Sequence, residues 1–183
     1  MKHFTSALFL VASFGLFGQN CTQPFISEYL EGSSNNKALE IVNPSSSPLN
    51  MSIYSISSFN NGNTSPTNTF QFPNITLPAN GVYVIANGNA DPSILSVSDT
   101  TSGVTWFNGD DAIVLFKNTD TLDIIGVVGT DPGTSWVVGS GATKEFTLVR
   151  KTTVQTGQTN WAIGAGEWDV SPQNTFTYLG SHS

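Results

Sequence analysis

Aspartates are the side chains whose type and spacing best suit chemistry in this sequence of 183 residues. Five of them occur in two neighbouring turn-rich segments: Asp99, Asp110, Asp111, Asp120 and Asp123. Carboxylate oxygens gathered at one place bind hard cations such as calcium, so Asp110, Asp111 and Asp123 are the candidate metal ligands. Their spacing does not match an EF-hand loop, and aspartate is common in turns for conformational reasons. We therefore favour a turn-forming role and keep calcium as the alternative.

Tryptophans are the second candidate set, because an indole held on a rigid sheet offers a large apolar surface to a sugar ring. Trp136, Trp161 and Trp168 lie in glycine-rich segments, and we expect them to be half exposed and available to a carbohydrate ligand. Trp106 lies beside a strong turn signal and is predicted to be in the core. Burial is the more common fate of tryptophan in a β-sandwich, so a structural role is favoured for the set.

Catalytic motifs are absent from the sequence. It contains no Gly-x-Ser-x-Gly elbow, no Walker loop, no His-Glu-x-x-His segment and no cysteine pair for zinc. The only histidines are His3, in the first residues, and His182, next to the last residue. A nuclease or a Ser-His-Asp enzyme would depend on that terminal histidine, and we predict that the protein is not an enzyme. Cys21 is the only cysteine, which excludes an internal disulfide.

Two glutamates, Glu28 and Glu40, lie within apolar strand-like runs, where an ionised carboxylate needs a partner. We expect both to be structural and to accept hydrogen bonds from a neighbouring strand or loop. Lys37 is the nearest candidate partner, and Glu31 is expected to be solvated.

Short alternating runs predict an all-β protein. In the first run Ile26, Glu28 and Leu30 share one face, and in its pairing partner Leu39 and Ile41 share a face. No helix of three turns and no repeat of fixed period is visible, so the pattern indicates a sandwich or barrel. The strand-like runs fall within residues 25–43, 49–59, 70–72, 82–86, 112–116, 122–128, 146–150 and 175–180.

The strongest turn signal is Asn108-Gly109-Asp110-Asp111, set between residues 106–107 and 112–116. Asn followed by Gly is typical of a two-residue hairpin turn, in which both residues adopt positive φ angles. We therefore predict a tight hairpin at this position.

Low charge and acidity restrict the classes of partner. Charged residues make up 10% of the chain, against a typical value of about 25%, so solubility depends on Ser, Thr, Asn and Gly, as is usual for extracellular β-proteins. The formal net charge is −7, with only six lysines and arginines. Both values argue against direct nucleic-acid binding.

Residues 1–19 have the form of a secretory signal peptide. Lys2 and His3 precede an apolar stretch that ends at residue 17, and small or polar residues follow it. That stretch is shorter than the ~20 residues that a transmembrane helix needs, and no later segment is long enough. We predict a protein that is secreted or held at the cell surface, with no membrane span.

Several segments resemble the lamin tail domain family, in particular its secreted bacterial branch. The resemblance implies an immunoglobulin-like β-sandwich over residues 25–183, and the family has no catalytic signature to carry over. The segments that carry it are Ile26-Ser27-Glu28, Leu39-Glu40-Ile41-Val42-Asn43, residues 77–86, residues 107–115, Thr147-Leu148-Val149-Arg150-Lys151 and Leu179-Gly180-Ser181-His182.

The expected function is that of a secreted, non-catalytic binding, adhesion or accessory module, whose partner is an unknown extracellular ligand or a secreted enzyme. A second interpretation is an accessory or truncated part of a secreted nuclease or phosphoesterase, because bacterial members of the family are often joined to such enzymes. A third is a calcium-stabilised carbohydrate-binding module, which depends on the aspartate-rich turns and the loop tryptophans. No cofactor other than calcium is implied.

Overall fold

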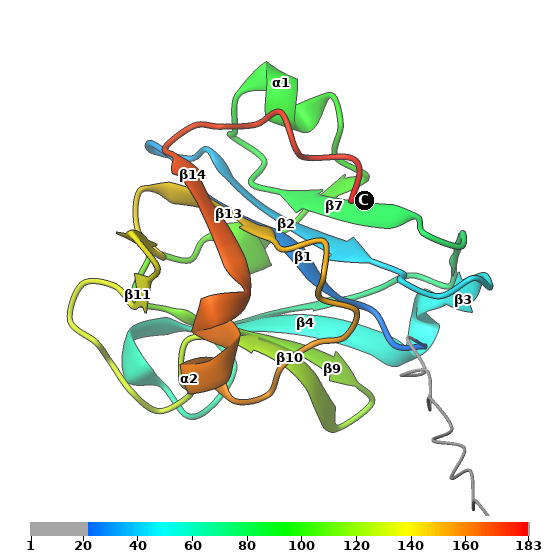
Figure 1. Cartoon of the computed structure of the whole chain (residues 1–183), viewed down its shortest axis with the longest axis horizontal. Coiled ribbons are helices and arrows are strands. Elements are labelled where there is room, and N and C mark those ends of the chain that lie inside the picture. The colour runs from blue at the N-terminus through cyan, green and yellow to red at the C-terminus, as the bar shows by residue number, and fades with distance from the viewer. Residues whose placement is uncertain (1–21, 183) are drawn as a thin grey trace, which may run out of the picture.

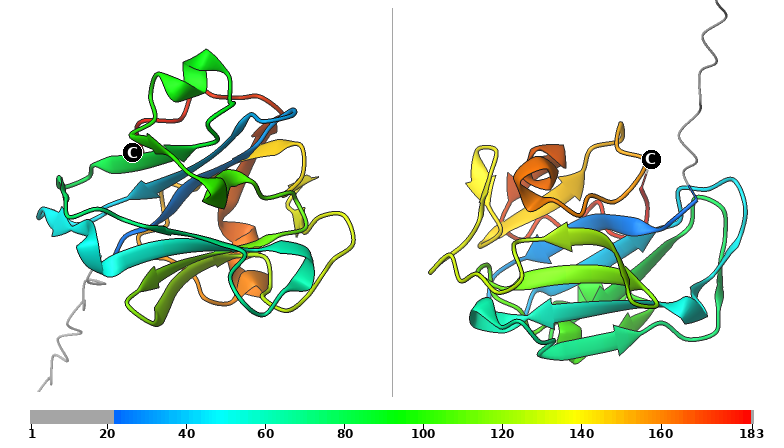
Figure 2. Two further views of the ribbon diagram at one scale, coloured as in Figure 1. Left: turned by 180° about the vertical axis from the view of Figure 1, so that it is seen from behind. Right: turned by 90° about the horizontal axis from the view of Figure 1, so that it is seen from below.

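The structure is a computed structural model and describes residues 22–182. The expected signal peptide and Cys21 lie outside the described residues. Two large β-sheets pack against each other as separate layers (Figures 1 and 2), and two short strand pairs lie beside them. The predicted all-β sandwich is confirmed.

The larger sheet has six strands in the order β14-β13-β1-β2-β7-β8. Its neighbouring strands are antiparallel except for β7 and β8, which are parallel. The strands are β1 (Phe25–Glu31), β2 (Lys37–Val42), β7 (Val82–Ala86), β8 (Thr100–Thr101), β13 (Phe146–Arg150) and β14 (Trp168–Pro172).

The smaller sheet is antiparallel, with the order β10-β9-β4-β5. Its strands are β4 (Tyr54–Phe59), β5 (Asn68–Gln71), β9 (Ala112–Lys117) and β10 (Asp120–Ile125). The short pairs are β3 (Leu49–Asn50) with β6 (Thr76–Leu77), and β11 (Val137–Val138) with β12 (Gly141–Ala142). The helical turns are η1 (Met51–Ile53), η2 (Asn60–Gly62), α1 (Pro92–Leu95), η3 (Gly103–Thr105), α2 (Trp161–Gly164) and η4 (Ala165–Glu167).

A β-bulge in β1 decides which of its side chains reach the core. The register between β1 and β2 shifts between Ile26 and Glu28, and such an extra residue reverses the alternation of faces beyond it. Ile26 and Tyr29 therefore both point between the sheets, whereas Leu30 packs on the outer face. The prediction that Ile26, Glu28 and Leu30 share one face is wrong for this reason.

The outer face of the six-stranded sheet is also covered. Leu30 and Val84 pack there against Ile94 of α1 and Leu179 of the C-terminal segment, which crosses this face beside α1 (Figure 1). The predicted strand at 175–180 does not form, and β14 is the last strand among the described residues. Leu179 anchors the segment by inserting its side chain, so no ladder of backbone hydrogen bonds is needed.

The predicted hairpin at Asn108-Gly109 does not form either. β9 pairs with β4 and β10, and residues 106–107 belong to no strand. Neither Asn108 nor Gly109 has a positive φ angle. Glycine is required there for space instead, because a Cβ on Gly109 would lie 2.6 Å from Cα of Lys144.

Candidate functional site

The three candidate calcium ligands do not meet in the structure. Asp111 is fully buried, and its carboxylate accepts the backbone N–H groups of Asn61 and Asn108 at 2.8 and 2.7 Å. Asp110 lines a hollow of about 240 Å³ with Glu31 and other residues. Within residues 22–182, no group of three His, Cys, Asp or Glu side chains is placed to hold a metal ion. The Asp111 carboxylate thus holds the backbone at Asn61 and Asn108 by hydrogen bonds.

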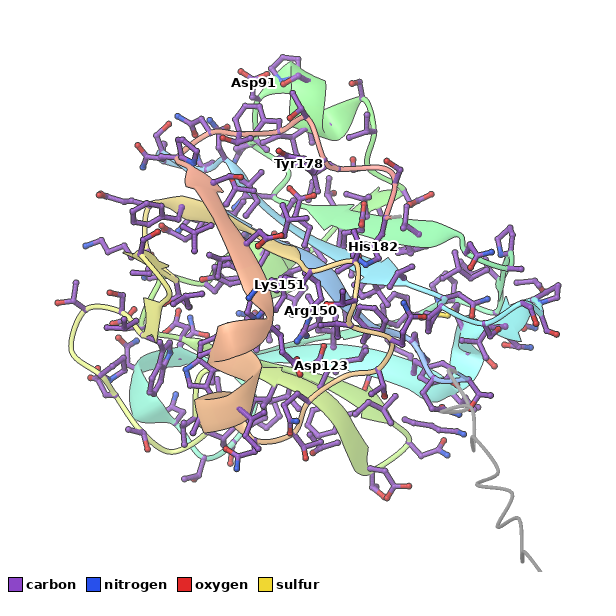
Figure 3. All side chains as sticks on the ribbon, viewed as in Figure 1. Asp91, Asp123, Arg150, Lys151, Tyr178 and His182 are labelled. Atoms are coloured by element: carbon purple, nitrogen blue, oxygen red, sulfur yellow. The ribbon has the colours of Figure 1, made fainter. Side chains whose placement is uncertain are left out.

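Asp123 lies elsewhere, in a closed polar network inside the sandwich. Its carboxylate accepts the N–H groups of Ile26 and Gln158, both at 2.9 Å, and forms an ion pair with Arg150 (Figure 3). The side chains of Asp123 and Arg150 are both fully buried. Asp123 therefore joins three separate segments of the chain and is not available to a ligand.

Arg150 is the centre of that network, and the sequence analysis missed it. Its guanidinium donates to Glu167 at 2.7 Å and to the carbonyl of Ile26 at 3.1 Å, and it lies 4.1 Å from the ring centre of Trp168. Arginine suits this role because its planar guanidinium carries several donors and also stacks on aromatic rings. The available signal was an arginine that ends an apolar strand in a chain with few cations.

The exposure of the tryptophans is almost the reverse of the prediction. Trp161 and Trp168 are only 7% and 4% exposed and belong to the core, so the expectation of half-exposed rings is wrong for both. Trp136 is partly buried and packs against the core. Trp106, predicted to be in the core, is 64% exposed.

Local structure explains why Trp106 points outward. It follows η3, whose Thr105 is fully buried, and it precedes Phe107, which is also fully buried and stacks on Tyr29 with ring centres 4.7 Å apart. The backbone N–H of Trp106 donates to the carbonyl of Gly103 at 3.0 Å. Anchored on both sides in this way, the short turn leaves the indole at the surface.

Beside this indole lies a polar pocket of about 270 Å³, which we call the Trp106 pocket. Three segments form it: the loop between β1 and β2, the loop between β7 and α1, and the turn after η3. Most of its lining is uncharged and polar, and the residues are Ser34, Asn35, Lys37, Asn87, Asn89, Trp106 and Asn108.

Short hydrogen bonds hold these loops to the sheet and to each other. The N–H of Asn87 donates to the carbonyl of Lys37 at 2.9 Å, and the side chain of Asn87 accepts the N–H of Asn89 at 3.0 Å. The side chain of Asn36 accepts the N–H of Asp91 at 2.8 Å and links the first two loops. The pocket is therefore built on fixed backbone.

Lys37 is the only charged residue in the lining among the described residues, and its ammonium group is occupied. Nζ donates to Oε1 of Glu31 at 2.8 Å, to the carbonyl of Phe107 at 2.6 Å and to Oδ1 of Asn108 at 3.3 Å. Glu31 is 6% exposed and also accepts the N–H of Glu145. The expectation that Glu31 is solvated is wrong, because Glu31 is the carboxylate that neutralises Lys37.

Other polar groups of the pocket have no hydrogen-bond partner in the part of the chain that the structure describes. Within residues 22–182, the side chains of Ser34, Asn35 and Asn89 are exposed and make no hydrogen bond. An amide side chain carries both donors and an acceptor, and a hydroxyl carries both as well. The Trp106 pocket thus presents neutral, unpaired hydrogen-bonding groups around one exposed aromatic ring.

Glu28 and Glu40 form a different kind of pair, directly opposite each other on β1 and β2. The Glu40 carboxylate accepts hydrogen bonds from the hydroxyl group of Ser27 and from the N–H of Gly180, both at 2.7 Å, as expected for a structural carboxylate. Oε1 of Glu28 is buried without a hydrogen-bond partner in the described part of the chain. Burial, and then the charge of Glu40, raise the pKa of Glu28 to about 9. Lys37 pairs with neither, contrary to the prediction.

His182 lines a second pocket, also of about 270 Å³, together with residues of β13, β14 and the C-terminal segment. Its ring meets the edge of Phe25 with centres 5.8 Å apart. Burial, and then the charge of Arg150, lower the pKa of the His182 imidazole. In the described chain no carboxylate pairs with His182, so the arrangement of a Ser-His-Asp enzyme is not formed.

A comparison with protein-family models finds that residues 19–130 match the Lamin Tail Domain. The chain belongs to the lamin tail domain family. A search of curated proteins finds no match. The family assignment and the two packed sheets together give an immunoglobulin-like β-sandwich.

The matched part of this lamin tail domain includes all three segments that form the Trp106 pocket, since the pocket residues run from 34 to 108. Lamin tail domains are non-catalytic immunoglobulin-like domains, which agrees with the absence of catalytic motifs from the sequence. In the described part of the chain, no helix has the length and apolarity needed to cross a membrane.

Proposed function

We propose that this lamin tail domain is an extracellular, non-catalytic binding module whose ligand occupies the Trp106 pocket. The observation that carries the proposal is the 64% exposure of Trp106 beside polar side chains that have no hydrogen-bond partner among residues 22–182. Exposing a large aromatic ring is unfavourable in water, and an exposed aromatic on a fixed backbone is typical of binding surfaces. A pocket of this kind gives an incoming molecule both apolar contact and hydrogen bonds.

Composition and the N-terminal segment support an extracellular location. The chain is only 10% charged and rich in neutral polar residues, and residues 1–19 have the pattern of an export signal. N-terminal sequencing of exported protein tests this part of the proposal. A mature chain that begins between Gly18 and Thr22 is expected, and exported protein that retains Met1 would contradict it.

Binding is tested with the water-insoluble extracellular fraction of the cells that produce the protein. Purified wild-type protein should sediment with this fraction, and Trp106→Ala should stay in the supernatant. Tyr178→Ala is the matched control, because Tyr178 is also an exposed aromatic, at 47%, but belongs to the C-terminal segment. Co-sedimentation of Trp106→Ala at the wild-type level would refute the proposed function.

The non-catalytic part is tested by incubation with DNA, RNA and a phosphomonoester in the presence of magnesium, manganese or calcium. We expect no turnover, because His182 packs on Phe25 and has no carboxylate partner among the described residues. Turnover that is abolished by His182→Ala would favour the nuclease or phosphoesterase interpretation instead.

A further inference from the structure

We propose that the Trp106 pocket binds a neutral saccharide and that it does so without a calcium ion. This inference rests on the proposed function, because it names the ligand class of the same pocket. The sequence suggested three other tryptophans for carbohydrate binding, and the inference assigns that role to Trp106 alone. It also gives the acidic residues no part in carbohydrate binding.

The apolar part of the argument is the indole itself. A pyranose ring has a face of C–H groups, and an exposed tryptophan offers a flat apolar partner of similar size. Val104 and Phe107 on either side of Trp106 are fully buried, so the backbone that carries the ring is fixed before the ligand arrives. A rigid contact surface loses little conformational entropy on binding.

The polar part is the rim of amides and the hydroxyl group. Each sugar hydroxyl both donates and accepts, and a side-chain amide can match that with its NH₂ group and its oxygen. Asn35 and Asn89 are exposed with both groups unpaired in the described chain, and Ser34 adds a hydroxyl. Asn87 and Asn108 use their side-chain oxygens within the protein, which leaves their NH₂ groups for a ligand.

The charge of the pocket selects against anions. An ammonium group has three protons to donate, and Lys37 directs them to Glu31, to the carbonyl of Phe107 and to Asn108. Lys37 is 7% exposed, and Glu31 balances its charge. A phosphate, sulfate or carboxylate would find no free cation here, on a protein with a net charge of −7.

The same lining gives no place for calcium. Calcium needs six to eight oxygen ligands and usually takes several from carboxylates. Among residues 22–182, no aspartate or glutamate lines the Trp106 pocket. Asp111 is the buried candidate calcium ligand that lies nearest in sequence to the pocket residue Asn108. Its carboxylate already accepts hydrogen bonds from two backbone N–H groups. Binding by neutral groups alone is the chemistry that these side chains support.

The test uses isothermal titration with neutral oligosaccharides, namely cello-, malto-, manno- and chito-oligosaccharides, and with dextran and dextran sulfate. Dextran and its sulfate share one backbone and differ in charge. We expect at least one neutral probe to bind and dextran sulfate to bind no better than dextran. Trp106→Ala should weaken the binding of that neutral probe by at least about tenfold, and EDTA should leave it unchanged.

Asn89→Ala is the second variant, because Asn89 is exposed and its removal should not disturb folding. It should weaken saccharide binding several-fold, whereas Gln173→Ala, which removes an exposed amide outside the pocket, should have no effect. Equal binding by wild type and Asn89→Ala would overturn the role of the amide rim and with it the inference.

The outcomes also separate this inference from the proposed function. Loss of sedimentation in Trp106→Ala without binding of any neutral probe would overturn the saccharide inference and keep the binding module. Stronger binding of dextran sulfate, or a requirement for calcium, would also overturn the inference. Sedimentation that ignores Trp106 would refute the proposed function, and the inference would fall with it.

Discussion

Two buried cations of this domain, Arg150 and Lys37, are both fully engaged, yet their surroundings differ. Arg150 donates to Asp123, Glu167 and Ile26 and is covered by aromatic rings, so its guanidinium finds its partners within the protein. Lys37 is equally occupied, but it shares the Trp106 pocket with an exposed indole and with amide groups that have no hydrogen-bond partner in the described chain. Polar groups that are paired internally stabilise the fold. Unpaired groups facing a pocket are the ones available to a ligand.

The largest effect is expected from removing the charge of Arg150. Arg150→Met leaves the fully buried carboxylate of Asp123 without its cation, and breaking a buried pair in this way costs about 3–5 kcal/mol. Urea denaturation measures the free energy of unfolding. Lys151→Ala is the control, because Lys151 is the neighbouring cation and is partly exposed. A loss below about 1 kcal/mol in Arg150→Met would mean that the network does not stabilise the fold.

Glu28 also has a buried polar atom without a hydrogen-bond partner in the described chain. Protonation of its carboxyl group explains that atom without a ligand. Its pKa is raised from 4.5 to about 9, so the folded protein holds a proton that the unfolded chain loses above pH 4.5. The contribution of Glu28 to stability is therefore greatest below pH 4.5, and it falls by about 1.4 kcal/mol per pH unit until the pH reaches about 9. Glu40, whose pKa is also raised by burial, acts in the same direction.

Glu28→Gln should remove most of this pH dependence, because glutamine does not ionise. At pH 7 the variant should be more stable than the wild type by about 1–3 kcal/mol, and the two proteins should converge near pH 4.5. Denaturation at several pH values between 4 and 9 provides the measurement. If stability instead rises with pH over this range, Glu28 is ionised in the folded protein and has a cationic partner.

An effect of similar size is expected at the turn that contains Gly109. Gly109→Ala would place a Cβ within 2.6 Å of Cα of Lys144, and the shift that relieves this overlap costs about 1–3 kcal/mol. Gly166→Ala is the matched control, since nothing lies within 4 Å of a Cβ at that position. Equal stability of the two variants would show that the loop at Lys144 moves freely.

The smallest effect on stability is expected at Trp106. Because the ring is mostly exposed and the buried anchors lie on either side of it, Trp106→Ala should change the free energy of unfolding by no more than about 0.5 kcal/mol. A thermal or urea denaturation curve close to that of the wild type is the expected result. A large loss would show that the ring supports the fold, and its exposure would then say nothing about a ligand.

Much of the fold could be predicted from alternation alone. The run at residues 82–86 is β7, and the runs at 112–116 and 146–150 are β9 and β13 to within one residue. The short helix α1 also has a signal in the sequence, because Asp91 caps it by accepting the N–H of Ser93 and Pro92 follows at the first helical position. Alternation of apolar and polar residues cannot reveal an extra residue inserted into a strand. The bulge in β1 was therefore not predicted.

The site was harder to predict, because exposure depends on contacts between distant segments. The sequence context of Trp106 resembles that of a core residue, and only the burial of Thr105 and Phe107 against other strands turns the indole outward. Trp168 shows the opposite case. It lies after a glycine-rich segment, yet Arg150 from β13 covers its ring. The glycine content of a segment therefore does not predict whether its tryptophan is exposed.

The most direct measurement of the central claim is the ¹⁵N–¹H spectrum of the tryptophan indoles during titration with the neutral saccharides. The chain has four tryptophans, and the peak that disappears in Trp106→Phe identifies Trp106. We predict that this peak moves to saturation with at least one neutral saccharide, whereas the peaks of Trp161 and Trp168 stay in place. Movement of the core tryptophans instead, or a Trp106 peak that none of the saccharides shifts, would contradict the assignment of this pocket.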